Sequence, residues 1–280
     1  MTDSLETRIA ELRPKLHRFA ARMMGSAFDG EDVVQDALAK ALTAREAGVT
    51  AANPEAWLFS VTHNAALDAL RKRRRREARE AAAIDDVTAS SADSRAAAMA
   101  GLRTFLQLPP AQRASVVLAD VLGHSLEEVA GTLGMTLAAV KAALHRGRGR
   151  LREIASAEPK EISASEAERA RLQAYADKFN AHDWDALRAL LAEDVRLDLV
   201  ARTELRGARN VRVYFTRYSE RPVWRVSVGS AEGQPALLYR DNSGAAPAFV
   251  VLLEWRDGRI VGIRDFHYAR YVMDALAYTG

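Results

Sequence analysis

The sequence contains no cysteine, which excludes disulfide bonds and thiol chemistry and removes the usual ligands of structural zinc. No apolar run approaches the roughly 18 residues of a membrane span. The first residues, MTDSLETRIAEL, carry acids and lack the apolar core of a signal peptide. Apolar and charged shares of 49% and 28% are ordinary for a globular protein. We therefore expect a cytoplasmic protein that does not associate with membranes.

The net charge of +3 is small, but it is unevenly placed. Residues 1–155 carry 22 Lys and Arg against 19 Asp and Glu, whereas residues 156–280 carry 18 of each. Much of the excess is the run RKRRRR at 71–76, here called the basic collar. Six successive residues surround a helix, so they cannot form one solvated stripe, and like charges at i,i+4 repel each other. The collar therefore predicts an anionic partner, with nucleic acid the first candidate.

Residues 5–80 have a helical periodicity. In the first segment apolar residues recur at Leu5, Ile9, Leu12, Leu16 and Phe19, with Pro14 as an interruption. In the second, Asp29 is the expected N-cap, and the buried stripe is expected to contain Val33, Val34, Ala37, Leu38 and Leu42. A third helix is predicted to begin with Asn53 as N-cap and Pro54 in the first helical position, and to run into the basic collar.

Residues 101–155 predict a helix-turn-helix. Ser125 and Glu128 form a capping-box pattern that opens a short helix. Ala130, Gly134 and Val140 then follow at the spacing of a small residue at the helix crossing, a glycine in the turn and a branched core residue. The second helix of the pair is rich in cations towards its end, which favours DNA as its partner. A structural helical pair with a solvated basic end would show a similar pattern.

From residue 166 the pattern changes to two amphipathic helices followed by strands, an α+β domain separate from the helical half. The final segment AFVVLLEWRDGRIVGIRDFHY predicts a hairpin whose two-residue turn is Asp257-Gly258. Pairing across that turn predicts that Leu253 and Ile263 lie on opposite faces of the sheet. Both faces are apolar, so we expect helices on one and a cavity or an interface on the other.

Three segments carry a resemblance to a known family. DGEDVVQDALAKAL, NPEAWLFSVTHNAALDALRKRRRR and LPPAQRASVVLADVLGHSLEEVAGTLGMTLAAVKAALHRGRGRLRE follow one another as do the two conserved regions of extracytoplasmic-function (ECF) sigma factors. AHDWDALRALLAEDVRLDL and DGRIVGIRDFHYARYV resemble the SnoaL-like, ketosteroid-isomerase-type cone. The resemblance implies a multidomain protein, with two all-α sigma regions, the second holding the helix-turn-helix, and then an α+β cone. The expected boundaries are 1–80 (region 2), 81–100 (linker), 101–155 (region 4), 156–165 (linker) and 166–280 (cone).

This resemblance assigns roles to residues in the first half. Asp32, Gln35 and Asp36 match the segment that binds core RNA polymerase, with Asp36 in place of the commoner glutamate. Asn64 matches the position that reads a flipped base of the −10 element, and Asp68 follows one turn later. The basic collar (Arg71, Lys72, Arg73, Arg74, Arg75 and Arg76) would contact backbone phosphates, which position a protein without reading sequence. Trp57 and Phe59 are candidates for holding the melted strand, although Trp57 suits the core equally well.

For the −35 element of promoter DNA, Lys141, His145 and Arg146 match the base-reading face of the recognition helix, and Arg148 matches a phosphate contact. Ala142 and Ala143 stand where polar or basic residues are frequent in the family, which predicts fewer base contacts here.

The cone offers weaker signals. Asp265 and His267 share one strand face, and Asp198, Trp224 and Tyr239 are candidates to join them in a cavity. No catalytic set or metal cluster can be assembled from spacing, and no cofactor is expected. The resemblance implies a regulatory domain, as such extensions are in the family, and no enzyme. It would act through a small molecule or through intramolecular docking. Two alternatives remain: a ligand-responsive helix-turn-helix regulator, and a cone-fold enzyme tethered to a DNA-binding arm.

Overall fold

The structure is a computed structural model, and it describes residues 5–83, 102, 104–154, 166–220, 223–241 and 246–280. The described residues fall into two compact units, one on each side of residues 155–165. The expected linkers at 81–100 and 156–165 therefore lie almost entirely outside the described residues. Among the helices of the described chain, none is long and apolar enough to cross a membrane.

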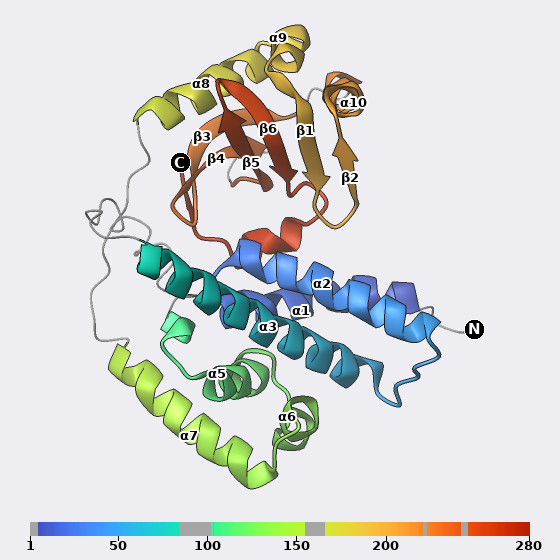
Figure 1. Ribbon diagram of the computed structural model, residues 1–280, viewed down its shortest axis with the longest axis vertical. Coiled ribbons are helices and arrows are strands. Elements are labelled where there is room, and N and C mark those ends of the chain that lie inside the picture. Colours follow the sequence, from blue (N-terminus) through green and yellow to red (C-terminus); the bar gives the residue numbers. More distant parts are fainter. Residues whose placement is uncertain (1–4, 84–101, 103, 155–165, 221–222, 242–245) are drawn as a thin grey trace. The chain divides into compact units, whose positions relative to one another are not determined.

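The first unit is helical (Figure 1). It contains α1 (Leu5–Met24), α2 (Ala27–Glu46), α3 (Pro54–Ala83), α5 (Pro110–Val116), the π-helical turn η1 (Val117–Val121), α6 (Leu126–Leu133) and α7 (Leu137–Ile154). α1, α2 and α3 pack on one another, and α6 and α5 pack against α3 and α1 respectively.

The helix starts are set by local side-chain caps. The Asn53 side chain accepts a hydrogen bond from the Ala56 N–H at 3.1 Å, as predicted for α3. Ser125 and Glu128 form the predicted capping box of α6. The prediction for α2 was wrong: its N-cap is Ser26, whose hydroxyl accepts from the Asp29 N–H at 3.1 Å. Gly25, at a φ of +70°, turns the chain so sharply after α1 that α2 begins before Asp29.

The buried stripe of α2 also differs from the prediction in one position. Val33, Val34, Ala37 and Leu38 are buried, but Leu42 is 41% exposed. Ala41 continues the stripe instead, because it lies seven residues after Val34 and thus on the same side of the helix. In α1 the helix continues through Pro14 without a break.

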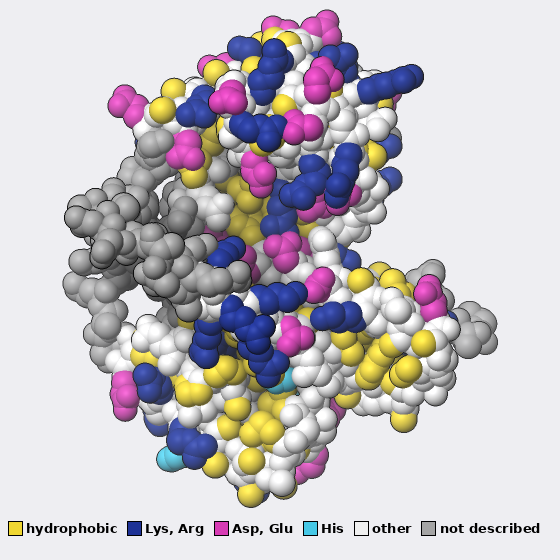
Figure 2. Space-filling view, in the orientation of Figure 1, with side chains coloured by type: hydrophobic (Ala, Val, Ile, Leu, Met, Phe, Trp, Pro, Cys, Tyr) yellow, Lys and Arg dark blue, Asp and Glu magenta, His cyan; other side chains and the backbone are white. Residues whose placement is uncertain are grey.

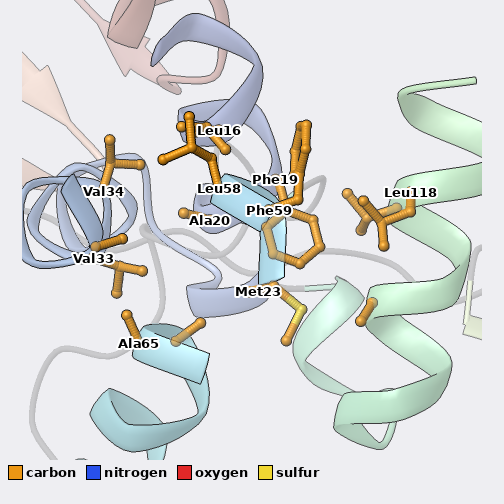
Figure 3. Close-up of a cluster of buried hydrophobic side chains, with 14 of the residues drawn as sticks. Leu16, Phe19, Ala20, Met23, Val33, Val34, Leu58, Phe59, Ala65 and Leu118 are labelled. Carbon is orange, nitrogen blue, oxygen red and sulfur yellow. The ribbon is translucent and has the colours of Figure 1, made fainter. Parts of the chain in front are cut away.

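The hydrophobic core of the first unit is shared by both helical segments of the sequence (Figure 3). Leu16, Phe19, Leu58 and Phe59 come from α1 and α3, and Leu118 of η1 lies beside the two phenylalanines. Val129, Val140 and Leu144, from α6 and α7, belong to the same cluster. The helix-turn-helix therefore packs on the three-helix segment through apolar side chains.

The second unit is a sheet covered by helices (Figure 1). The helices are α8 (Glu166–Asn180), α9 (Trp184–Ala189), α10 (Ala208–Glu220) and the 3-10 turn η2 (Arg270–Asp274). The strands are β1 (Leu191–Leu199), β2 (Thr203–Arg206), β3 (Arg225–Ala231), β4 (Gln234–Arg240), β5 (Phe249–Arg256), β6 (Arg259–Asp265) and β7 (Tyr278–Thr279). Their order in the sheet is β2-β1-β6-β5-β4-β3-β7, and β1 runs parallel to β6.

The predicted hairpin is present, but its face assignment was wrong. Asp257 and Gly258 both have positive φ and form the two-residue turn between β5 and β6. A register shift between Glu254 and Trp255 then places Ile263 opposite Leu253, on the same face of the sheet. An irregularity of this kind moves every following side chain to the other face. The sequence pattern also missed α10, β2 and β7.

Candidate nucleic-acid interface and a cavity in the second unit

The acidic surface of α2 lies on its solvent side. Asp32 and Asp36 are exposed and Gln35 is half-buried, while Val33 and Val34 between them face the core. Asp36 is 4.0 Å from Lys40, one turn later in the helix. The three residues thus form an accessible surface that holds two carboxylates and one amide.

The polar residues of α3 lie one turn apart on its solvent side. Asn64 and Asp68 are exposed, and Ala65 and Ala66 beside them are buried. The Arg71 guanidinium donates to the Asp68 carboxylate at 2.9 Å. Both groups are more than half exposed, so this ion pair is weak and leaves Asn64 accessible.

The basic collar surrounds α3 as expected from its spacing. Arg71, Lys72, Arg74, Arg75 and Arg76 are exposed, and Arg73 is partly covered. Figure 2 shows the dark blue side chains gathered along this part of α3. Arg73 lies 3.7 Å from Asp29 of α2, which makes a loose ion pair across the two helices.

A groove brings the acidic surface and the collar face to face. Its α2 wall includes Asp29, Asp32 and Asp36, and its α3 wall includes Lys72, Arg73 and Arg76. The carboxylates therefore partly neutralise the cations of α3 across the groove. The collar is exposed, but the carboxylates of the α2 surface reduce its positive charge.

Of the two candidate aromatic residues, Phe59 is not available to DNA. It is fully buried, with its ring edge-to-face against Phe19 at 5.8 Å and against His124 at 5.0 Å. The expectation that Phe59 holds a melted strand was therefore wrong, because α6 and the segment before it cover this side of α3. Trp57 is half-buried and packs at the edge of the same core.

The helix-turn-helix has the geometry that its spacing predicts. Gly134 ends α6 at a φ of +63°, a left-handed conformation suited to glycine, and Val140 is fully buried. Lys141, His145 and Arg148 lie on one side of α7, and line a shallow pocket with Leu126. Arg146 is exposed. Ala143 is only 2% exposed, so a polar side chain at this position would enter the core.

Arg148 is the most constrained of the predicted −35 residues. Its guanidinium donates twice to Asp120 of η1, at 2.9 and 2.6 Å. Such a bidentate pair fixes the plane of the guanidinium. The pair raises the pKa of Arg148 further above its ordinary value, mainly through these hydrogen bonds.

The second unit contains a cavity of about 600 Å³ between α10, β1, β2 and the segment after β6. Apolar side chains from the strands and from α10 line most of it, and three arginines with one glutamate lie among them. At its buried end is Asp265, the last residue of β6, which is 1% exposed.

Three donors converge on Asp265. The hydroxyls of Tyr214 and Tyr218 donate to Oδ2 at 2.9 and 3.0 Å, and the backbone N–H of His267 donates to Oδ1 at 2.7 Å. Burial nevertheless raises the pKa of this carboxyl to about 6, since desolvation outweighs the three hydrogen bonds. Burial and the charges of Arg270 and Arg202 lower the pKa of His267 below its ordinary value.

The five predicted cavity residues separate into two groups. Trp224, Asp265 and His267 line the cavity. Leu197 and Leu199 of β1 face the cavity, so Asp198 between them lies on the other face of the sheet. There it pairs with Arg264 in the parallel register, and its carboxylate is 3.5 Å from the Arg264 guanidinium. Tyr239 is fully buried behind the cavity, stacked on Phe249 at 4.7 Å. Neither Asp198 nor Tyr239 is brought to the cavity.

Sequence reasoning missed the tyrosines and arginines of this cavity. Tyr214, Arg217 and Tyr218 lie on α10, which was not predicted, and Arg202 lies in the turn between β1 and β2. A periodicity of apolar residues at Val211, Tyr214, Phe215 and Tyr218 was the available signal. Within the described residues no cluster of three or more His, Cys, Asp or Glu could hold a metal ion.

Comparisons with known proteins match three segments of the chain. Residues 9–76 match the family model for Sigma-70 region 2, residues 102–151 that for Sigma-70, region 4, and residues 172–263 that for the SnoaL-like domain. The chain is 33% identical to the RNA polymerase sigma factor CarQ of Myxococcus xanthus, over 54% of this chain and 89% of that protein. It is 28% identical to the probable ECF RNA polymerase sigma factor SigI of Mycobacterium tuberculosis, over 86% of each.

Other comparisons are partial or distant. The crystal structure of the Mycobacterium tuberculosis ECF sigma factor SigJ is 21% identical and covers 94% of this chain and 95% of that one, with a TM-score of 0.38. The chain spans less than two thirds of some curated relatives, 61% of one and 55% of another.

Proposed function

The chain belongs to the extracytoplasmic-function (ECF) RNA polymerase sigma factors, and we propose that it binds core RNA polymerase and directs transcription initiation at promoters that it selects. The observation that carries this proposal is that one unit combines the exposed collar of α3 with a separate helix-turn-helix. A regulator with one helix-turn-helix would leave the collar and the acidic α2 surface without a role.

The polymerase contact is assigned to Asp32, Gln35 and Asp36. Their exposed carboxylates suit a basic partner and would repel DNA. Because the same carboxylates face Lys72, Arg73 and Arg76 across the groove, a basic polymerase element would compete with these cations. Polymerase binding would thereby free the collar for phosphate.

The promoter contacts divide between α3 and α7. Asn64 is assigned to base reading in the −10 element, since an amide both donates and accepts hydrogen bonds, with Asp68 beside it. The collar is assigned to backbone phosphates. In the −35 element, Lys141, His145 and Arg146 are assigned to base edges. Arg148, already oriented by Asp120, is assigned to a backbone phosphate.

The second unit is assigned a regulatory role and no catalytic one. The matching curated relatives are named as sigma factors. A variant truncated after Ala155 should still bind core polymerase. At equal polymerase occupancy it should initiate transcription at a level different from that of the full chain. Equal transcript yields over a range of concentrations would contradict a regulatory role.

The polymerase assignment is tested with two surface variants. The double variant Asp32→Ala, Gln35→Ala should bind core polymerase at least tenfold more weakly, while the control Glu46→Ala, at the exposed end of the same helix, should bind normally. Both variants should remain folded, because surface substitutions change the free energy of unfolding by about 0.5 kcal/mol or less. Equal affinity of both variants for core polymerase would refute the assignment.

The activity itself is tested by run-off transcription with purified core polymerase and a library of promoter fragments. The full chain should produce transcripts with defined start sites, and mapping those sites identifies the −10 and −35 elements. Polymerase binding without any specific start site would contradict a role in promoter selection.

A further inference from the structure

The cavity of the second unit has no part in the polymerase and promoter contacts proposed above. We propose that it binds an amphipathic organic acid, a molecule with an apolar ring-bearing body and one anionic group that is held by Arg202, Arg217 and Arg270 at the exposed end of the cavity. The proposal rests on the size of the cavity, its apolar lining and the separation of charge along it.

Size and lining suit a small organic molecule. A cavity of about 600 Å³ lies within the range of roughly 300–1,000 Å³ typical of small-molecule sites. Leu197, Leu199 and Leu205 supply the strand wall, and Val213 and Val223 lie opposite. Val213 and Val223 are 53% and 43% exposed, so part of the apolar lining is in contact with water. A bound apolar body would remove this surface from water.

The arginines at the exposed end outnumber the acidic residues there: Glu220 also lines the cavity, but no ion pair joins it to these arginines within the described residues. Arg202, Arg217 and Arg270 are all exposed, and none forms an ion pair with a described carboxylate. The Arg202 guanidinium lies over the Tyr268 ring at 4.2 Å, and that of Arg270 lies over the Trp224 ring at 5.4 Å. These ring contacts hold two guanidiniums in place, and Arg270 Nε also donates to the His267 carbonyl at 3.3 Å, which leaves the terminal nitrogens of both groups available to an anion.

The buried end carries the opposite charge. Asp265 is fully enclosed, and its carboxylate already accepts hydrogen bonds from Tyr214, Tyr218 and the His267 N–H. An anionic group would be repelled there and attracted by the arginines at the other end. The charge distribution therefore sets one orientation, with the apolar body inward and the acidic group outward.

A matched pair of fluorescent probes tests the proposal. 1-Anilinonaphthalene-8-sulfonate and N-phenyl-1-naphthylamine have the same ring body, but only the first carries an anionic group. The intact chain should bind the sulfonate at one site, at least tenfold more tightly than the neutral amine, as expected for charge-assisted hydrogen bonds to guanidinium.

Three variants locate the binding. Arg202→Gln with Arg270→Gln should weaken binding of the sulfonate by about tenfold or more and leave binding of the amine unchanged. Arg212→Gln, on the exposed side of α10 and outside the cavity, is the matched control and should bind both probes normally. Val213→Trp, which fills the cavity from an exposed position, should weaken both probes.

The outcomes separate the alternatives. Equal affinity for the two probes, or an arginine variant that behaves like Arg212→Gln, would overturn the proposed organic acid and favour a neutral ligand. Probe binding that Val213→Trp leaves unchanged would place the site elsewhere and refute the proposal. Thermal unfolding of each variant shows whether the second unit remains folded, since loosened structure also binds the sulfonate.

Discussion

Truncation of Phe59 to alanine tests the shared core of the first unit. The ring is fully buried between Phe19 of α1 and His124, which precedes α6. If the two helical segments share one core, then a cavity at this position must destabilise both of them. If α6 and α7 do not share this core with α3, then the loss of stability is confined to α1, α2 and α3.

The expected magnitude follows from the burial and the ring contacts. Removal of a fully buried phenylalanine costs about 3–5 kcal/mol in transfer and cavity terms. The edge-to-face contact with Phe19 adds about 0.5–1.5 kcal/mol. A total of about 3.5–6.5 kcal/mol is a large share of the roughly 5–15 kcal/mol that stabilises an ordinary domain. The melting temperature of the first unit should fall by roughly 10–20 °C.

Hydrogen exchange of backbone amides is the assay, because it reports on each helix and separates the first unit from the second. In Phe59→Ala, protection should fall by a similar factor in α1, α3, α6 and α7, while α8 and α10 serve as the internal control. Phe59→Leu should lose about 1–2 kcal/mol, since it keeps most of the volume. A loss below about 1 kcal/mol for Phe59→Ala, or unchanged protection in α6 and α7, would refute the shared core.

Two further predictions concern the promoter and the cavity. Asn64→Ala should reduce the discrimination between bases in the −10 element by about 1–3 kcal/mol. Arg74→Gln with Arg75→Gln should instead weaken binding to all promoters alike, and should reduce the salt dependence of binding by nearly one unit of slope for each lost phosphate contact. Competition binding at several salt concentrations checks both variants, and an unchanged −10 preference in Asn64→Ala would exclude base reading. The Asp265 carboxyl should titrate with a midpoint near pH 6 in a carbon-13 NMR experiment, because its pKa is raised from 3.8 to about 6 by burial. The folded chain then binds this proton more tightly than the unfolded chain, so a stability contribution of about 3 kcal/mol that is present below pH 4 should be lost as the pH rises past 6. Asp265→Asn should remove that slope, and a midpoint near 4 would contradict the burial argument.

Features that depend on neighbouring residues could be predicted from the sequence. The Asn53 cap, the Ser125–Glu128 capping box and the Asp257-Gly258 turn each form between residues a few positions apart. Whether such a cap or turn forms can therefore be predicted without knowledge of the rest of the fold. The Ser26 cap was missed because it depends on how tightly Gly25 turns the chain after α1.

Features that depend on distant segments could not be predicted in this way. Phe59 is buried by residues about 60 positions later in the chain, so its own helix pattern does not decide whether it faces DNA or the core. The face of Ile263 was reversed by one register shift between β5 and β6. The run VRVYF in α10 alternates like a strand at its start, which concealed the helix that supplies Tyr214 and Tyr218 to the cavity.

The sheet order has a consequence for synthesis on the ribosome. β1 is hydrogen-bonded in parallel to β6, which the ribosome adds only after about 60 further residues. At roughly 5–20 residues per second, β1 spends several seconds with one unpaired edge and with Leu197 and Leu199 in water. Asp194, Arg196 and Asp198 alternate with the apolar side chains and discourage pairing with other nascent chains during this interval. Replacing these charged residues with neutral ones should lower the yield of folded protein in the cell, while the free energy of unfolding of the purified protein changes little.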